Sequence, residues 1–196
     1  MIAAIVVGHD ANSQGAIATD GASEWRWNRP LALMVQAELQ SLGRAASVHY
    51  RPQFGSYTDK MRQLVAEIPR EARVAVELHF NSLDTAGLTP EKLPRRTTVL
   101  HWPGSAEGER LAGHLAPEIA RAIGGPSRRW TVRGQATSWS GASLDFLKLT
   151  RCPAVIVEPH FGCTSDDHQA ATRARDTGRL AEGIARGIHA FLGGAA

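Results

Sequence analysis

Residues 2–9 read Ile2-Ala3-Ala4-Ile5-Val6-Val7-Gly8-His9, an apolar run of strand length that is closed by a glycine and a histidine. Its length and its β-branched residues are typical of a buried strand. The remaining runs of this kind lie at residues 46–50, 74–80, 97–102 and 154–158. We therefore expect five strands, distributed along most of the chain.

Helical periodicity fills the segments between these strands. Apolar residues recur every three or four positions, which places them on one face of a helix in three groups: Leu31, Val35, Leu39 and Leu42; Met61, Leu64, Val65 and Ile68; Leu111, Leu115, Ile119 and Ile123. One more helix is predicted from about Asp166 to Leu192, ended by Gly193-Gly194. Alternating strands and helices predict an α/β fold, with residues 1–196 forming a single three-layer αβα domain around a central, mostly parallel, twisted sheet.

Composition limits the class of protein. The 196 residues are 43% hydrophobic, enough for one substantial core, and the net charge of +3 is modest. No apolar run approaches the roughly 20 residues that span a bilayer, so we expect no membrane partner. The first residues lack a basic leader and a cleavage site, which indicates a mature domain without an export signal. Cys152 and Cys163 are too few for a disulfide framework, and two separate thiols are expected rather than a bridge.

A basic cluster, Arg128-Arg129-Trp130-Thr131-Val132-Arg133, has the composition of a nucleic-acid patch. One short cluster is weak support for such a function, and we expect no nucleic-acid partner. Nothing in the sequence indicates an oligomer, and a monomer is expected.

Side chains that can do chemistry stand at the ends of three predicted strands. His9 follows the first strand, His79 ends the strand at 74–80, and Glu158 ends the strand at 154–158. In open α/β sheets the ligand crevice lies beyond the carboxyl ends of the strands, so these residues should converge. Strand alternation also turns Glu77, His79 and Asn81 to one face and places on the other face Val74, Val76, Leu78 and Phe80.

Two histidines near one crevice indicate a metal site. A catalytic zinc ion takes three nitrogen or oxygen ligands and keeps one open position, and Glu24 is the best third ligand. Because Pro30 would break the interior of a helix, we expect the first helix to start near Asn28 as its N-cap, with Glu24 in the lead-in. The alternatives are that His79 is a core histidine and that Glu24 is an exposed carboxylate at a helix start.

Taken together, these motifs resemble those of the zinc-dependent N-acetylmuramoyl-L-alanine amidases, cell-wall hydrolases of the autolysin and phage endolysin type. The matching motifs are Gly8-His9, Glu24, His79-Phe80-Asn81, Pro153-Ala154-Val155-Ile156-Val157-Glu158 and, in the place of a helix arginine, Arg62. The resemblance implies that His9, Glu24 and His79 bind one zinc ion per chain and that Glu158 is the catalytic carboxylate.

The resemblance further implies that peptidoglycan is the substrate, and no separate wall-binding domain is recognised in the chain. Action is then expected in the periplasm, in the cell wall or outside the cell. The chain would reach this location as a phage endolysin released through a holin, or as a mature enzyme whose signal has been removed. Four tryptophans flank the expected site and either stack on sugar faces or fill packing gaps: Trp25, Trp27, Trp130 and Trp139.

Two positions depart from the family pattern. Asp10 follows His9 where the family has glycine, and we interpret it as an acceptor that fixes a histidine tautomer. His160 follows Glu158 in a Pro159-His160-Phe161-Gly162 turn, where it either orients substrate or has no special role. Arg62 and Asn81 are further candidates for contacts to the substrate or to the ligands.

The implied chemistry is zinc-assisted hydrolysis of an amide. Two imidazoles and one carboxylate leave a zinc site with a charge of about +1, which favours ionisation of water at a pKa near 7. Attack on the lactyl carbonyl would be assisted by Glu158, which takes the proton and passes it to the alanine nitrogen. A structural ion pair of Glu158 with Arg133 or Arg151 is the alternative.

Two other functions remain open from the sequence. One is a zinc amidohydrolase or carboxypeptidase-like enzyme acting on small amides. The other is a non-catalytic module that binds peptidoglycan.

Overall fold

A computed structural model describes residues 2–86, 88–89, 92–138, 141 and 143–193 of the chain. In this part, one sheet is formed by β1 (Ile2–Val7), β2 (Ala45–Tyr50), β3 (Ala72–Leu78), β4 (Arg96–His101), β5 (Arg129–Gly134) and β6 (Ala154–Glu158). The strand order is β2-β1-β3-β6-β4-β5. Every neighbouring pair is parallel except β4 and β6, so β4 and β5 run against the other four strands. The expected mostly parallel sheet is confirmed.

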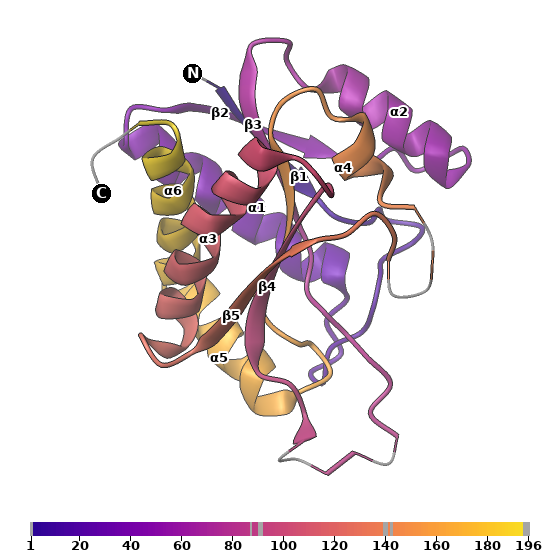
Figure 1. The fold of residues 1–196 in the computed structure, drawn as a ribbon. Coiled ribbons are helices and arrows are strands. Elements are labelled where there is room, and N and C mark those ends of the chain that lie inside the picture. The colour runs from indigo at the N-terminus through magenta and orange to yellow at the C-terminus, as the bar shows by residue number, and fades with distance from the viewer. Residues whose placement is uncertain (1, 87, 90–91, 139–140, 142, 194–196) are drawn as a thin grey trace.

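Helices cover both faces of this sheet (Figure 1). One face packs against α1 (Glu24–Ser41), α3 (Ala106–Gly124), α5 (Ser165–Asp176) and α6 (Arg179–Phe191). The other face carries α2 (Tyr57–Glu67) and α4 (Asp145–Leu149). The three-layer αβα arrangement is therefore confirmed. In the described residues, no helix combines the length and the apolar character needed to cross a bilayer.

Strand β1 lies inside the sheet and supplies both halves of the core. Ile5 and Val7 belong to the apolar cluster on the α1 side, whereas Ala4 and Val6 belong to the cluster on the α2 side. A strand that is covered on both faces has no polar side to show, which explains why its sequence is a continuous apolar run.

Helix α1 begins earlier than the sequence suggested. Its N-cap is Ser23, whose Oγ accepts a hydrogen bond from the Arg26 amide, and Glu24 is the first helical residue. The expectation that Asn28 caps the helix is wrong. Pro30 is accommodated inside α1 because it lies on the exposed face, where water can bind the Arg26 carbonyl that the proline leaves without a donor.

The C-terminal segment forms two helices rather than the single one predicted. Helix α5 ends at Asp176 and α6 begins at Arg179. Between them, Gly178 adopts φ of 81°, in the left-handed region that glycine enters at little cost. The chain can therefore turn here, which an apolar periodicity running through both helices concealed.

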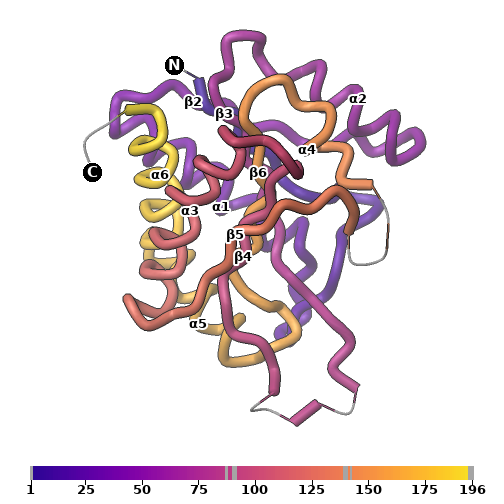
Figure 2. The backbone as a smooth tube through the Cα atoms, in the orientation of Figure 1, coloured from indigo at the N-terminus to yellow at the C-terminus, as the bar shows by residue number. Residues whose placement is uncertain are grey.

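Two elements escaped the sequence analysis. Strand β5 is an edge strand with mostly exposed side chains, so the basic cluster at 128–133 carries no apolar signal. Helix α4 has five residues, too few to show a period. The connection between β3 and β4 extends beyond the sheet (Figure 2). Of the residues named in the sequence analysis, Trp139 and Gly194 lie outside the described part.

Helices α3 and α6 approach closely because α6 presents glycines to α3. A Cβ atom on Gly187 would lie 2.9 Å from the Leu115 Cα and 3.0 Å from the His114 carbonyl oxygen. A Cβ on Gly183 would lie 2.9 Å from the Glu118 carbonyl oxygen. These contacts are with backbone atoms, which cannot rotate away.

We expect Gly187→Ala to lower the free energy of unfolding by about 1 to 3 kcal/mol, because overpacking at a backbone contact outweighs the better helix propensity of alanine. Gly113→Ala is the matched control, since Gly113 lies on the exposed side of α3 with nothing within 4 Å of an added Cβ. It should stabilise the protein by about 0.5 to 1 kcal/mol. Urea denaturation measures both changes, and a neutral Gly187→Ala variant would show that the two helices can separate.

Candidate metal centre

His9 stands at the carboxyl end of β1 in an unusual backbone conformation. Its φ is 65°, and it is the one non-glycine residue with positive φ in the described part of the chain. Such a conformation is disfavoured for a side chain with a Cβ, so packing around it must hold it in place. Gly15 supplies part of that packing, because a Cβ there would lie 2.6 Å from the His9 ring.

His79 follows β3 and lies across the end of β1. A Cβ on Gly8 would be 2.5 Å from the Cε1 and Nε2 atoms of the His79 ring, so only glycine leaves room for this imidazole. The rings of His9 and His79 meet edge to face, with centroids 4.9 Å apart. The Gly8-His9 pair therefore serves two purposes, supplying one imidazole and making space for the second.

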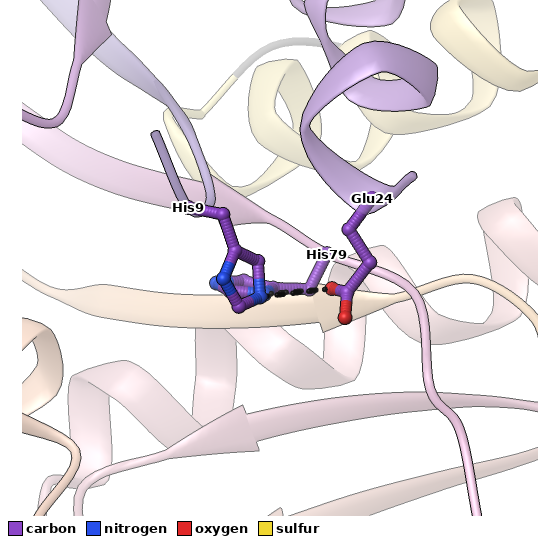
Figure 3. Close-up of side chains that lie close together, drawn as sticks. All are labelled: His9, Glu24 and His79. Carbon is purple, nitrogen blue, oxygen red and sulfur yellow. Dashed lines mark hydrogen bonds and ion pairs between the residues drawn. The ribbon is translucent and has the colours of Figure 1, made fainter. Parts of the chain in front are cut away.

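Glu24 opens α1 and points into the same place. Its Oε1 accepts a hydrogen bond from the Ala16 amide at 3.0 Å, and its Oε2 accepts one from the Phe80 amide at 3.2 Å. Oε2 also lies 3.0 Å from His79 Nδ1 and 3.4 Å from His9 Nε2. Figure 3 shows both imidazoles and the carboxylate directed toward one another.

The three side chains fit a zinc ion in both donor type and spacing. One ligand atom from each of His9, Glu24 and His79 lies within 4.8 Å of the others. Ligands that bind a tetrahedral zinc at about 2.0 to 2.2 Å lie about 3.3 to 3.5 Å apart, close to the distances from Glu24 Oε2 to the two imidazoles. Two nitrogens and one oxygen form the kind of set that leaves a fourth position open.

Charge is balanced tightly within this group. Burial alone would raise the pKa of Glu24, but hydrogen bonds and charge from His79 and His9 hold that pKa far below its usual range. Burial likewise opposes the charge on His79, yet Glu77 and Glu24 raise the pKa of its imidazole to about 10. Without a metal, Glu24 is therefore ionised and the imidazole of His79 carries a positive charge. The carboxylates that stabilise this charge would also stabilise a bound cation.

Glu158 stands beside this group at the end of β6. Its Oε2 accepts a hydrogen bond from Asn81 Nδ2 at 2.6 Å. Burial raises the pKa of Glu158 to about 7, with the charge of His79 opposing this shift and that of Glu24 adding to it. Near neutral pH, Glu158 can therefore both accept and release a proton, as a general acid and base must.

A crevice of about 400 Å³ opens over these residues, within the usual size range of small-molecule sites. His9, Glu24, His79 and Glu158 all line it. Its walls further include Arg51, Tyr57, Asn81 and Leu144. A substrate bound in the crevice would contact the three candidate metal ligands and the Glu158 carboxylate together.

Comparison with known proteins agrees with this geometry. The model of the N-acetylmuramoyl-L-alanine amidase family Amidase_3 matches residues 3–190. The chain belongs to this amidase family. No curated protein sequence matches it significantly.

Solved structures of amidases share the fold over nearly the whole chain. The AmiC2 amidase of Nostoc punctiforme is 23% identical, covers 98% of this chain and 97% of its own, and has a TM-score of 0.76. The CwlD amidase of Clostridioides difficile, solved with the GerS lipoprotein, is 15% identical with coverages of 97% and 98% and a TM-score of 0.77. The catalytic domain of the CD27L endolysin, which targets Clostridia difficile, is 19% identical with coverages of 100% and 99% and a TM-score of 0.74. At these identities the likeness establishes the fold alone.

The side chains of Asp10 and Arg62 of this amidase pair with residues other than the histidines and Glu24 in the structure. Asp10 accepts hydrogen bonds from the amides of Asn12 and Ser13 and from Lys60 Nζ at 2.7 Å, so it closes the loop after β1 onto α2 instead of orienting an imidazole. Arg62 is largely exposed on α2, with Asp59 3.8 Å away. We assign neither residue a contact with substrate.

His160 is buried on the opposite side of the sheet from the crevice. Its ring packs between Trp27 and Phe80, and its Nε2 lies 2.9 Å from His168 Nδ1. Burial holds the pKa of His160 well below its usual value, so the ring is neutral. We assign His160 a packing role, and the same holds for the fully buried Trp27.

Two crevice residues of the amidase carried a signal that the sequence analysis did not use. Arg51 directly follows β2, as His9 follows β1, and the rule about carboxyl strand ends applies to it equally. Glu77 shares the face of His79 and was noted only for that. In the structure Arg51 Nη2 donates to Glu77 Oε1 at 2.9 Å, and both side chains are buried.

The raised pKa of Glu158 predicts a pH-dependent gain in stability for Glu158→Gln in the metal-free protein. The folded state holds the Glu158 proton more tightly than the unfolded chain, so wild-type stability falls as pH rises from about 4.5 to 7. The uncharged glutamine escapes this loss and still accepts from Asn81. At pH 8 the variant should be more stable by about 1 to 3 kcal/mol, and the gain should vanish at pH 4.

Urea unfolding in the presence of a chelator at both pH values measures this difference. An equal gain at pH 4 and pH 8 would mean that packing, and not the carboxylate charge, causes the change.

Proposed function

We propose that this chain is a zinc-dependent enzyme that hydrolyses the amide bond between N-acetylmuramic acid and L-alanine in peptidoglycan. The family to which the chain belongs supports the bond that is cut. The convergence of His9, Glu24 and His79 beside Glu158 supports the use of a metal, and it is the observation on which the proposal depends.

When bound by these three residues, zinc supplies a Lewis acid that favours the ionisation of water and polarises a carbonyl. The roles of the chain's own residues follow from their positions. Glu24 is fixed by the Ala16 and Phe80 amides, so its carboxylate does not have to reorganise to bind a cation. The imidazoles of His9 and His79 are held by close packing against glycines.

Glu158 transfers a proton from the attacking water to the leaving amine. Its Oε2 is engaged by Asn81, which leaves Oε1 to take a proton from the attacking water. The same oxygen then gives that proton to the amide nitrogen of the departing alanine, so the carbonyl carbon gains a hydroxyl and the C–N bond breaks. A pKa near 7 suits both transfers, because the group is then neither too weak as a base nor too weak as an acid.

We further propose that residues 1–196 act as one catalytic domain of the autolysin or endolysin type. Its site of action would be the cell wall or the periplasm, where peptidoglycan lies. Nucleic acid and membrane are not proposed as partners, and a monomer suffices because a single chain supplies the whole centre.

We expect one tightly bound zinc per chain, because three protein ligands at suitable spacing bind this ion well. Elemental analysis of protein purified without added metal measures the content, and the His9→Ala, His79→Ala double variant should lose it. Zinc well below one per chain even after zinc addition, or full retention in the double variant, would contradict the proposed centre.

Digestion of purified peptidoglycan should release free alanine amino groups without new reducing sugar ends.

Glu158→Gln should lower turnover by about 10² to 10⁴-fold while zinc content stays near that of the wild type, since glutamine cannot accept the proton. New reducing ends would indicate a glycosidase, and turnover of small amides without wall lysis would favour the amidohydrolase alternative. Binding of wall material by the wild type without any cleavage would favour a recognition module.

A further inference from the structure

The imidazole of His79 has its two nitrogens in different surroundings. Nδ1 lies 3.0 Å from Glu24 Oε2, inside the group that would hold zinc. Nε2 lies 3.5 Å from Glu77 Oε2, on the edge of the ring that packs over Gly8. Nδ1 is therefore the nitrogen that faces Glu24, and Nε2 is the one that faces Glu77.

Glu77 is in turn fixed from its other side. Its Oε1 accepts a hydrogen bond from Arg51 Nη2 at 2.9 Å, and the guanidinium of Arg51 lies 5.4 Å from the centre of the Tyr57 ring. The strand register explains this contact: Tyr50, Val7 and Leu78 are paired across β2, β1 and β3, so the next residues, Arg51, Gly8 and His79, follow side by side.

The ion pair between Arg51 and Glu77 is buried, and burying two charges has a cost in free energy. Glu77 is 1% exposed, and the Arg51 side chain is 7% exposed. Removing two charges from water costs several kcal/mol per ion, so a buried ion pair often adds little net stability over apolar residues of similar volume. This pair can have a role other than stability, because Glu77 lies beside the proposed ligand His79. A carboxylate next to the nitrogen that does not bind the metal orients the ring of a ligating histidine.

We propose that Glu77, held by Arg51, is a positioning residue that keeps His79 protonated at Nε2 and presents Nδ1 to zinc. This inference rests on the proposed function, in which His79 is a zinc ligand. Glu77 does not touch the substrate or the ion in this role. It holds the ring in one orientation, so that less order has to be imposed when the metal binds.

The matched control is a second buried ion pair of the same kind. Arg128 and Asp167 have side-chain exposures of 7% and 1%, against 7% and 2% for Arg51 and Glu77. Asp167 accepts from Arg128 and from the Phe161 amide and contacts none of the three proposed ligands. Asp167→Asn therefore carries a comparable loss of a buried charge without touching His79.

The experiment measures zinc affinity by competition with a chelator in the wild type, Glu77→Gln and Asp167→Asn. We expect Glu77→Gln to bind zinc 10- to 100-fold more weakly, the usual effect of losing such a partner, and Asp167→Asn to bind it as the wild type does. Because Glu77→Gln leaves the Arg51 charge buried and unpaired, the Arg51→Gln, Glu77→Gln double variant is measured as well. It should show the same loss of affinity in a fold without that unpaired charge.

Nitrogen NMR of the zinc-loaded protein supplies a readout that a purely structural role would not change. In the wild type, the Nε2 proton of His79 should exchange slowly with solvent, and in both Glu77 variants it should exchange faster. Zinc affinity within about threefold of the wild type in the folded Glu77 variants would overturn the inference, and so would an equal loss in Asp167→Asn. A wild type that binds no zinc would remove the proposed centre itself, which separates the two failures.

Discussion

The imidazole of His79 rests on Gly8, the residue directly after β1, and the geometry of the candidate metal centre depends on this contact. The two strands are neighbours in the sheet, so the contact fixes His79 with the precision of the strand pairing itself. Glu24 then approaches from α1 and is held by amides on both of its oxygens. A side chain larger than glycine at position 8 would displace the ring and separate the donors.

Three carboxylates lie close together at the crevice, and their surroundings drive their pKa values apart. Glu24 and Glu77 lie against cationic partners and stay ionised, the latter with its pKa lowered to about 2 against the effect of burial. At Glu158 burial outweighs the opposing charges of His79 and Arg96 and raises the pKa to about 7. Carboxylates with separated pKa values can take different roles, one binding a cation and another transferring a proton.

The fold is shared with amidases of Nostoc punctiforme and Clostridioides difficile at identities of 23% and 15%. Such a fold tolerates extensive change because a sheet buried on both faces requires apolar residues of suitable volume more than particular ones. The centre is less tolerant, since it needs a glycine, two imidazoles and a carboxylate at fixed places. Next to the centre, the Arg51–Glu77 pair connects the end of β2 to β3, and the Asp10–Lys60 pair connects the loop after β1 to α2.

The sequence by itself determined the α/β class, five of the strands and the candidate residues at the crevice, because buried strands appear as apolar runs of strand length and the polar residues that end them stand out in the local sequence. It could not place β5, whose exposed side chains lack an apolar pattern, or the break at Gly178, which interrupts an otherwise continuous period. Only the tertiary structure decided that His160 packs on the face of the sheet away from the crevice and that Asp10 pairs with Lys60. Both residues lie in turns, where no periodicity sets the direction of a side chain. The pairing of Arg51 with Glu77 likewise depended on the tertiary structure, because these residues are 26 positions apart and meet here across the end of β1, which lies between β2 and β3.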